Sequence, residues 1–238
     1  MNYDQPLSLG LYQATPNQSD YGIRELLSGN KIDLLVLPEA YISVSQIKIM
    51  SQLAKDMQIW IVCGVDEYTD DKRYQSAVMI SSSGDLVATH RKTSLTSWEI
   101  DEGYESGDEI NIIETPFGRI GLSICYEVHF PEVSRIYALQ GAELIINPIN
   151  IGMWNEQQYF AWHSVVSCRA SENQVYVAGC SHLSGAIPIS FVYDPEGQPL
   201  LNLRGAGFIS IIELDLNVVI PPEIKFTDRR PDLYKSLA

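Results

Sequence analysis

Short apolar runs rich in β-branched residues recur along this chain and end at Gly, Pro, Asn or Asp. Runs of this kind predict β-strands, and segments with helical periodicity lie between some of them. The pattern indicates one α/β domain, residues 1–238, built on a strand-dominated mixed sheet system. We expect strands at 7–14, 33–38, 59–65, 74–81, 110–115, 119–125, 143–148, 175–180, 189–194 and 207–214.

Three segments predict helices. Residues 43–57 repeat apolar side chains at helical spacing and begin with Ser43 as a capping residue. Residues 131–141 start with a proline and end at a glycine, and residues 155–173 place an apolar stripe on one face. The stretch 94–109 is polar and acidic, and we expect it to be irregular.

Charge and length narrow the class of protein. A net charge of −14 argues against nucleic acid, because a phosphate-binding surface needs an excess of Lys and Arg. No apolar run approaches the ~18 residues that span a bilayer, and the N-terminus has no basic stretch followed by an apolar core. The histidines form no HxxxH or HExxH pair. We therefore expect a cytoplasmic protein that binds no nucleic acid, membrane, metal or cofactor.

The four cysteines lack CxxC spacing, so we expect free thiols. Three of them lie inside apolar strand or helix patterns, which favours buried structural thiols; these are Cys63, Cys168 and Cys180. Cys125 instead ends a strand just before the helix that starts at Pro131. By alternation it shares a strand face with Gly121 and Ser123, whose small size is expected to leave room beside its sulfur. A nucleophile at such a turn has backbone N–H groups nearby that can hold an oxyanion.

Two charged residues also stand near strand ends. Glu39 follows an apolar strand closed by Pro38, and alternation places it on the face of Leu35 and Leu37. Desolvation there would raise its pKa and make it a general base, although a loop carboxylate that caps the next helix is the alternative. Lys92 follows a strand-like stretch. A lysine there is a solvated surface charge unless its side chain points into a cavity that Glu39 and Cys125 share.

Three segments, LLVLPEAY, HRKTSL and GLSICYEVHFPE, resemble in order and spacing the signature segments of the nitrilase superfamily of carbon–nitrogen hydrolases. The similarity continues in AELIINP, RASENQVYVAG (169–179), DPEG (194–197) and TDRRPDLY (227–234), and so covers nearly the whole chain. The chain departs from the family at His90, where Tyr is frequent, and at Ser94, where His is frequent. The resemblance implies an α-β-β-α sandwich of the nitrilase type.

The resemblance also implies a catalytic set. Glu39 would be the general base, Lys92 the oxyanion-stabilising cation and Cys125 the nucleophile, with the backbone N–H of Tyr126 as a second oxyanion donor. A thiol with a reference pKa of about 8.5 needs such a base or cation to react at neutral pH. The family commonly has a second glutamate between the lysine and the cysteine. Glu99 is the first candidate for it, and Glu102 in EGY is the alternative.

The implied reaction is hydrolysis of a small amide or N-carbamoyl compound through an acyl-enzyme thioester, with release of ammonia. Cys-Tyr-Glu at 125–127 favours amidases over true nitrilases, which usually have Cys-Trp-Glu. The alternatives are a non-catalytic homologue used for binding or assembly, and an acyltransferase with the same triad. The family also implies a homodimer or higher even oligomer. Residues just after the relevant strand ends are the expected substrate pocket: His129, Asn150, Met153 and Trp154.

Overall fold

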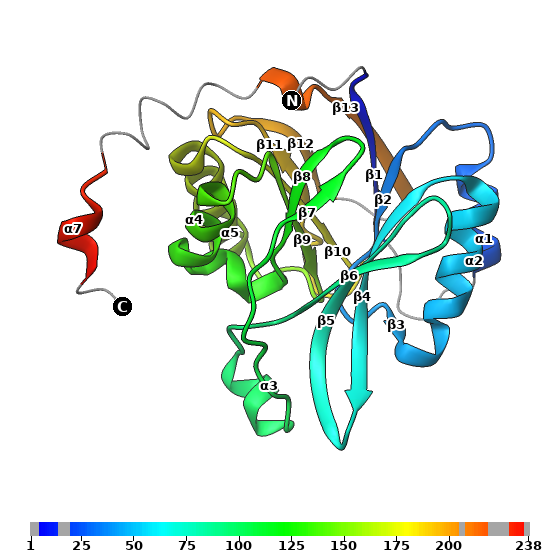
Figure 1. Cartoon of the computed structure of the whole chain (residues 1–238), viewed down its shortest axis with the longest axis horizontal. Helices are drawn as coiled ribbons and strands as arrows, with labels where there is room; N and C mark the ends of the chain where they lie inside the picture. The colour runs from blue at the N-terminus through cyan, green and yellow to red at the C-terminus, as the bar shows by residue number, and fades with distance from the viewer. Residues whose placement is uncertain (1–4, 14–19, 205–207, 219–228, 236–238) are drawn as a thin grey trace.

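The computed structural model describes residues 5–13, 20–204, 208–218 and 229–235. Two β-sheets face each other, and helices cover the outer face of each sheet (Figure 1). The layers therefore run helix, sheet, sheet, helix. The expected α-β-β-α sandwich is confirmed. Some residues of the predicted strands and family segments lie outside the described residues: Ala14, Gly207 and residues 227–228.

The first sheet has the order β13-β1-β2-β4-β5-β6, and β3 adds to it by pairing with β4. Strands β1, β2 and β4 run parallel, whereas β13, β5 and β6 join antiparallel to their neighbours. Its strands are β1 (Leu7–Gln13), β2 (Leu34–Val36), β3 (Ile42–Ser43), β4 (Trp60–Thr69), β5 (Lys72–Ile80), β6 (Leu86–Arg91) and β13 (Phe208–Leu214).

The second sheet has the order β12-β11-β10-β9-β8-β7. Its central strands β8, β9 and β10 are parallel, and the flanking strands are antiparallel. Its strands are β7 (Ile113–Thr115), β8 (Gly118–Leu122), β9 (Leu144–Ile149), β10 (Tyr176–Ser181), β11 (Ser190–Tyr193) and β12 (Pro199–Leu203).

The helices are short except for α5, which Asn155 caps by accepting from the backbone N–H of Gln158. They are α1 (Asp20–Leu27), α2 (Ile47–Met57), α3 (Ser97–Asp101), α4 (Pro131–Leu139), α5 (Glu156–Asn173) and α7 (Pro231–Tyr234), with 3-10 turns η1 (Val44–Gln46), η2 (Cys125–His129) and η3 (Leu216–Val218). None of the helices in the described residues is long and apolar enough to cross a membrane.

Three apolar clusters hold the layers together. The central cluster lies between the sheets and includes Leu9, Val36, Leu122 and Ile146. A second cluster packs the first sheet against α1 and α2, and a third packs the second sheet against α4 and α5. Each fully buried aliphatic side chain contributes about 1.5–3 kcal/mol, so the alternating strand residues stabilise both sides of each sheet. Tyr137 of α4 packs against β8 at Gly121, where a Cβ atom would come within 2.6 Å of the tyrosine ring.

Several sequence predictions about these elements need correction. Residues 94–109 are not wholly irregular, because Thr96 caps the short helix α3 by accepting from the backbone N–H of Glu99. The helix predicted from Ser43 starts as η1, and α2 begins only at Ile47. The strands expected at 33–38 and 110–115 are shorter than predicted, and β12 was not predicted at all. Its residues are exposed or half-buried and begin with Pro199, and proline argues against a strand in the sequence.

Candidate active site

The Lys92 ammonium lies between two glutamates. Its Nζ is 2.9 Å from Glu39 Oε1 and 2.5 Å from Glu99 Oε1. All three side chains are at most 5% exposed. Buried charges persist only when they are paired and hydrogen-bonded, so this arrangement holds one ammonium against two carboxylates.

Cys125 opens η2 just after β8, and its thiol lies close enough to the Glu39 carboxylate for each group to shift the pKa of the other. The nearby backbone N–H of Asn150 favours the ionised form of this thiol and so acts to lower its pKa. Its φ of 45° lies in the left-handed region, which is costly for a residue with a side chain. Asn147 supports this turn, because its Nδ2 donates to the carbonyls of Ser123 (2.5 Å) and Cys125 (3.2 Å).

Burial sets the protonation of these groups. It raises the pKa of Glu39, against the opposing effect of Lys92, and it raises the pKa of the Cys125 thiol. Burial alone would lower the pKa of Lys92, but Glu39, the Cys125 sulfur and Glu99 together raise it. The thiol therefore rests protonated beside a carboxylate of raised basicity and a permanent cation.

The Glu39 turn is fixed by its backbone. Glu39 N–H donates to Ile149 O across the sheets at 3.4 Å, and His182 Nε2 donates to Glu39 O at 2.7 Å. A Cβ atom on Gly64 would stand 2.3 Å from both Glu39 Cα and Pro38 O. Only a glycine on β4 lets this turn approach so closely.

The predicted strand alternation around Glu39 is wrong. Strand β2 ends at Val36, so the period of two does not extend to Glu39. Leu35 and Leu37 pack on the helix side of the first sheet, whereas the Glu39 carboxylate meets Lys92 and Cys125. The predicted role of Gly121 is also wrong, because the ring of Tyr137 fills the space beside it.

The two candidate second glutamates differ in position. Glu99 is 4% exposed, and its second carboxylate oxygen accepts from Thr96 N–H while the first contacts Lys92. Glu102 is exposed at the C-terminal end of α3. The structure therefore brings Glu99, and not Glu102, to Lys92.

The expected pocket residues lie around the cysteine turn at different depths. Tyr126 directly follows Cys125, and its ring packs against the ring of His129, which also meets Trp162 edge-on. Met153 is half-buried and pairs with Ile187, whereas Trp154 is 64% exposed at the start of α5. Burial lowers the pKa of His129, so its ring is neutral near pH 7.

The expectation that Cys168 is buried is wrong. It lies on α5 but on the exposed side of the helix, whereas Cys63 and Cys180 are buried. Burial raises the pKa of the Cys63 thiol and raises that of Cys180 to about 12. The helical stripe of Tyr159, Trp162 and Val166 faces the core, and Cys168 does not belong to it.

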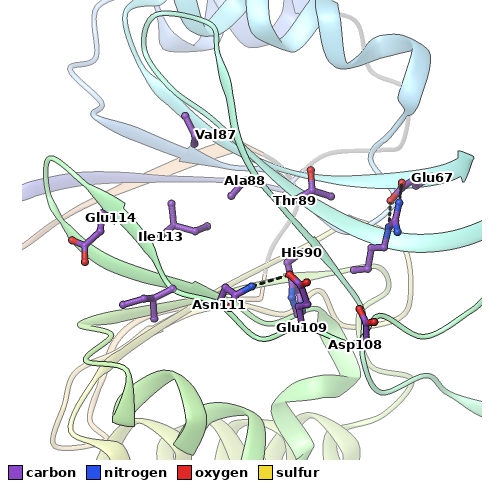
Figure 2. A pocket seen from close by; sticks show the side chains of 12 residues that line it. Glu67, Val87, Ala88, Thr89, His90, Asp108, Glu109, Asn111, Ile113 and Glu114 are labelled. Carbon is purple, nitrogen blue, oxygen red and sulfur yellow. Dashed lines mark hydrogen bonds and ion pairs between the residues drawn. The ribbon is translucent and has the colours of Figure 1, made fainter.

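A groove with a volume of about 690 Å³ opens between β6 and the segment 108–114 (Figure 2). His90 contributes to its wall, together with acidic residues such as Glu67 and Asp108. Neither Lys92 nor Cys125 is among the described residues that line it. The groove is therefore separate from the cluster of reactive side chains.

Sequence reasoning missed the residues that support this cluster. Glu127, Thr93 and His90 connect the lysine segment to the cysteine turn, and Asn147 holds the turn from β9. An acidic residue two positions after Cys125, inside an apolar segment, is the one signal that could have indicated Glu127.

The sequence of this chain is similar to those of known proteins. The profile of the carbon–nitrogen hydrolase family matches residues 22–221. A probable nitrilase of Schizosaccharomyces pombe is 32% identical over 80% of this chain and 73% of its own length. The chloroplastic omega-amidase of Arabidopsis thaliana is 30% identical over 78% of this chain, which spans only 55% of that protein.

A solved structure agrees in fold. An amidase from Nesterenkonia sp. AN1, with the acetamide moiety of fluoroacetamide on its active-site cysteine, superposes with a TM-score of 0.82. It is 21% identical and covers 98% of this chain and 97% of its own. By its sequence, layers and family match, this chain belongs to the carbon–nitrogen hydrolase family.

Proposed function

We propose that this chain hydrolyses a small amide or N-carbamoyl compound with Glu39, Lys92 and Cys125, through an acyl-enzyme thioester. One observation carries the proposal: a buried lysine is held by two glutamates, and one of these glutamates lies beside a cysteine thiol. The omega-amidase and amidase relatives support an amide substrate.

The first half-reaction breaks the C–N bond. The Cys125 thiol gives its proton to Glu39 while the sulfur attacks the carbonyl carbon. Lys92 Nζ and the backbone N–H of Tyr126 donate to the oxyanion, each lowering the barrier by about 3 kcal/mol. Glu39 then passes its proton to the leaving nitrogen, the C–N bond breaks, and ammonia leaves from a primary amide.

The second half-reaction restores the thiol. Glu39 takes a proton from a water molecule whose oxygen attacks the thioester, and Glu99 orients this water. The C–S bond breaks, Glu39 returns the proton to the sulfur, and the carboxylic acid is released. The raised pKa of Glu39 suits it to both proton transfers, because a more basic carboxylate takes a proton from the thiol or from water more readily.

Ammonia release from ω-amides, N-carbamoyl amino acids and nitriles tests this function, with Cys125→Ala as the control. We expect release from at least one amide or carbamoyl compound and none from the variant. Release mainly from nitriles would contradict the substrate class. Binding of an amide without any turnover would favour the non-catalytic scaffold, and product formation only with an added amine would favour acyl transfer.

We also propose that residues 1–238 form one hydrolase domain that acts in the cytoplasm as a homodimer or higher even oligomer. The face formed by η2, α4 and α5 supports association, because Tyr126, Ile136, Leu139 and Phe160 are exposed there. Exposed apolar side chains on elements that contact one another are typical of protein interfaces. Light scattering at micromolar concentration is expected to exceed the monomer mass of 26.7 kDa, and a monomer would contradict the proposal.

A further inference from the structure

Glu127 is a second buried carboxylate, two residues after the cysteine, and the proposed reaction does not use it. It is 0% exposed, and both its oxygens are occupied. Oε1 accepts from Thr93 N–H (2.7 Å) and Thr93 Oγ1 (2.5 Å), while Oε2 accepts from Ile124 N–H (2.6 Å) and His90 Nε2 (2.9 Å). Burial would raise its pKa, but these hydrogen bonds lower it.

These partners belong to different sheets. His90 and Thr93 lie on either side of Lys92, where the first sheet's strand β6 ends. Ile124 directly precedes Cys125, where the second sheet's strand β8 gives way to η2. The Glu127 carboxylate thus joins the segment that carries the cation to the turn that carries the nucleophile.

Lys92 Nζ can donate to the oxyanion only if it keeps the right distance from the Cys125 sulfur. An error of about 1 Å in such a geometry can cost about 100-fold in rate. Lys92 and Cys125 come from separate sheets, so strand pairing within either sheet does not fix this distance. Resting on the proposed function, we propose that Glu127 is a positioning residue that holds Lys92 in register with Cys125, with His90 and Thr93 as its donors.

The competing explanation is that Glu127 only stabilises the fold. Glu143 provides a matched control, because it is also buried and accepts a backbone hydrogen bond on the same sheet. Its donor is Arg119 N–H at 2.7 Å, near the start of β8 and away from Cys125. Loss of either carboxylate removes buried hydrogen bonds, but only Glu127 touches the lysine segment.

The test compares Glu127→Gln with Glu143→Gln in the full chain. For each variant, kcat and KM are measured on the amide that releases most ammonia, normalised to the amount of alkylatable Cys125, together with Tm. Glutamine keeps the length of the side chain but places an amide N–H₂ against donors. We expect Tm to be lower in both variants. Only Glu127→Gln is expected to have a lower kcat, by about 10- to 100-fold, with a KM within about threefold of that of the parent protein.

A second pair keeps the test decisive if Glu127→Gln does not fold. Thr93→Val removes the hydroxyl donor and keeps the shape, and Thr93→Ser keeps the hydroxyl. We expect Thr93→Val to lower kcat about tenfold and Thr93→Ser to recover most of this loss. Unchanged kcat in both Glu127→Gln and Thr93→Val would overturn the positioning role. Ammonia release that survives Cys125→Ala would instead overturn the proposed function.

Discussion

Replacing Glu99 by glutamine tests how the two carboxylates share Lys92. The substitution keeps the size and one acceptor oxygen but removes the charge 2.5 Å from Lys92 Nζ. A hydrogen bond between charged groups contributes about 1.5–3 kcal/mol, which is about 10- to 150-fold in rate if it is lost only in the transition state. Glu99 also orients the water that gives its proton to Glu39, and loss of a group that takes part in such an acid–base step costs about 10² to 10⁴.

We expect turnover of Glu99→Gln to fall by about 10² to 10⁴, because Glu99 both holds the ammonium and orients the hydrolytic water. Cys125 is expected to remain present and alkylatable. Steady-state kinetics beside Glu102→Gln provide the control, since Glu102 is exposed and its loss is expected to be nearly silent. Activity of Glu99→Gln within about threefold of the parent, or a large loss only in Glu102→Gln, would refute this reasoning.

Three further predictions follow from the same geometry. Brief iodoacetamide treatment is expected to modify Cys125 and the exposed Cys168 but not the buried Cys63 and Cys180. Only modification of Cys125 is expected to stop turnover. Peptide mapping, compared with residual activity, checks this. Gly64→Ala is expected to push the Glu39 turn away and to lower kcat about 100-fold in the folded protein, whereas unchanged kcat would contradict the close contact. Burial raises the pKa of Glu39 above its usual value of 4.5, so its carboxylate becomes protonated while the pH is still above 4.5. We expect kcat/KM to fall as this proton binds. A pH–rate profile that is still flat at pH 4.5 would contradict this.

Much of the fold could be predicted because burial is periodic. The runs that became β9 and β10 are almost continuously apolar and are buried on both faces of their sheet. Helix α5 was predicted with bounds close to those observed, since Asn155 caps its start and its apolar stripe packs on the second sheet. The edge strand β12 was missed, because it is short, begins with a proline and contains leucines in place of β-branched residues.

The site, too, has residues that the sequence could predict and contacts that it could not. Each of Glu39, Lys92 and Cys125 stands at a strand end, and family motifs in the right order single them out. Alternation could not orient Glu39, because the turn after Pro38 includes Ala40 at a φ of 50°, which breaks the strand period. The links through Glu127 and Asn147 join residues that are 22 to 37 positions apart, and no local pattern encodes such contacts.

The central claim is that Cys125 carries the acyl group during turnover. Mixing the protein with its best amide substrate, quenching in acid and mapping peptides by mass spectrometry measures this directly. We expect an adduct with the mass of the substrate's acyl group on Cys125, which forms and decays with ammonia release and is absent in Cys125→Ala. Turnover without any adduct, an adduct on Cys168 in its place, or ammonia release by Cys125→Ala would contradict it.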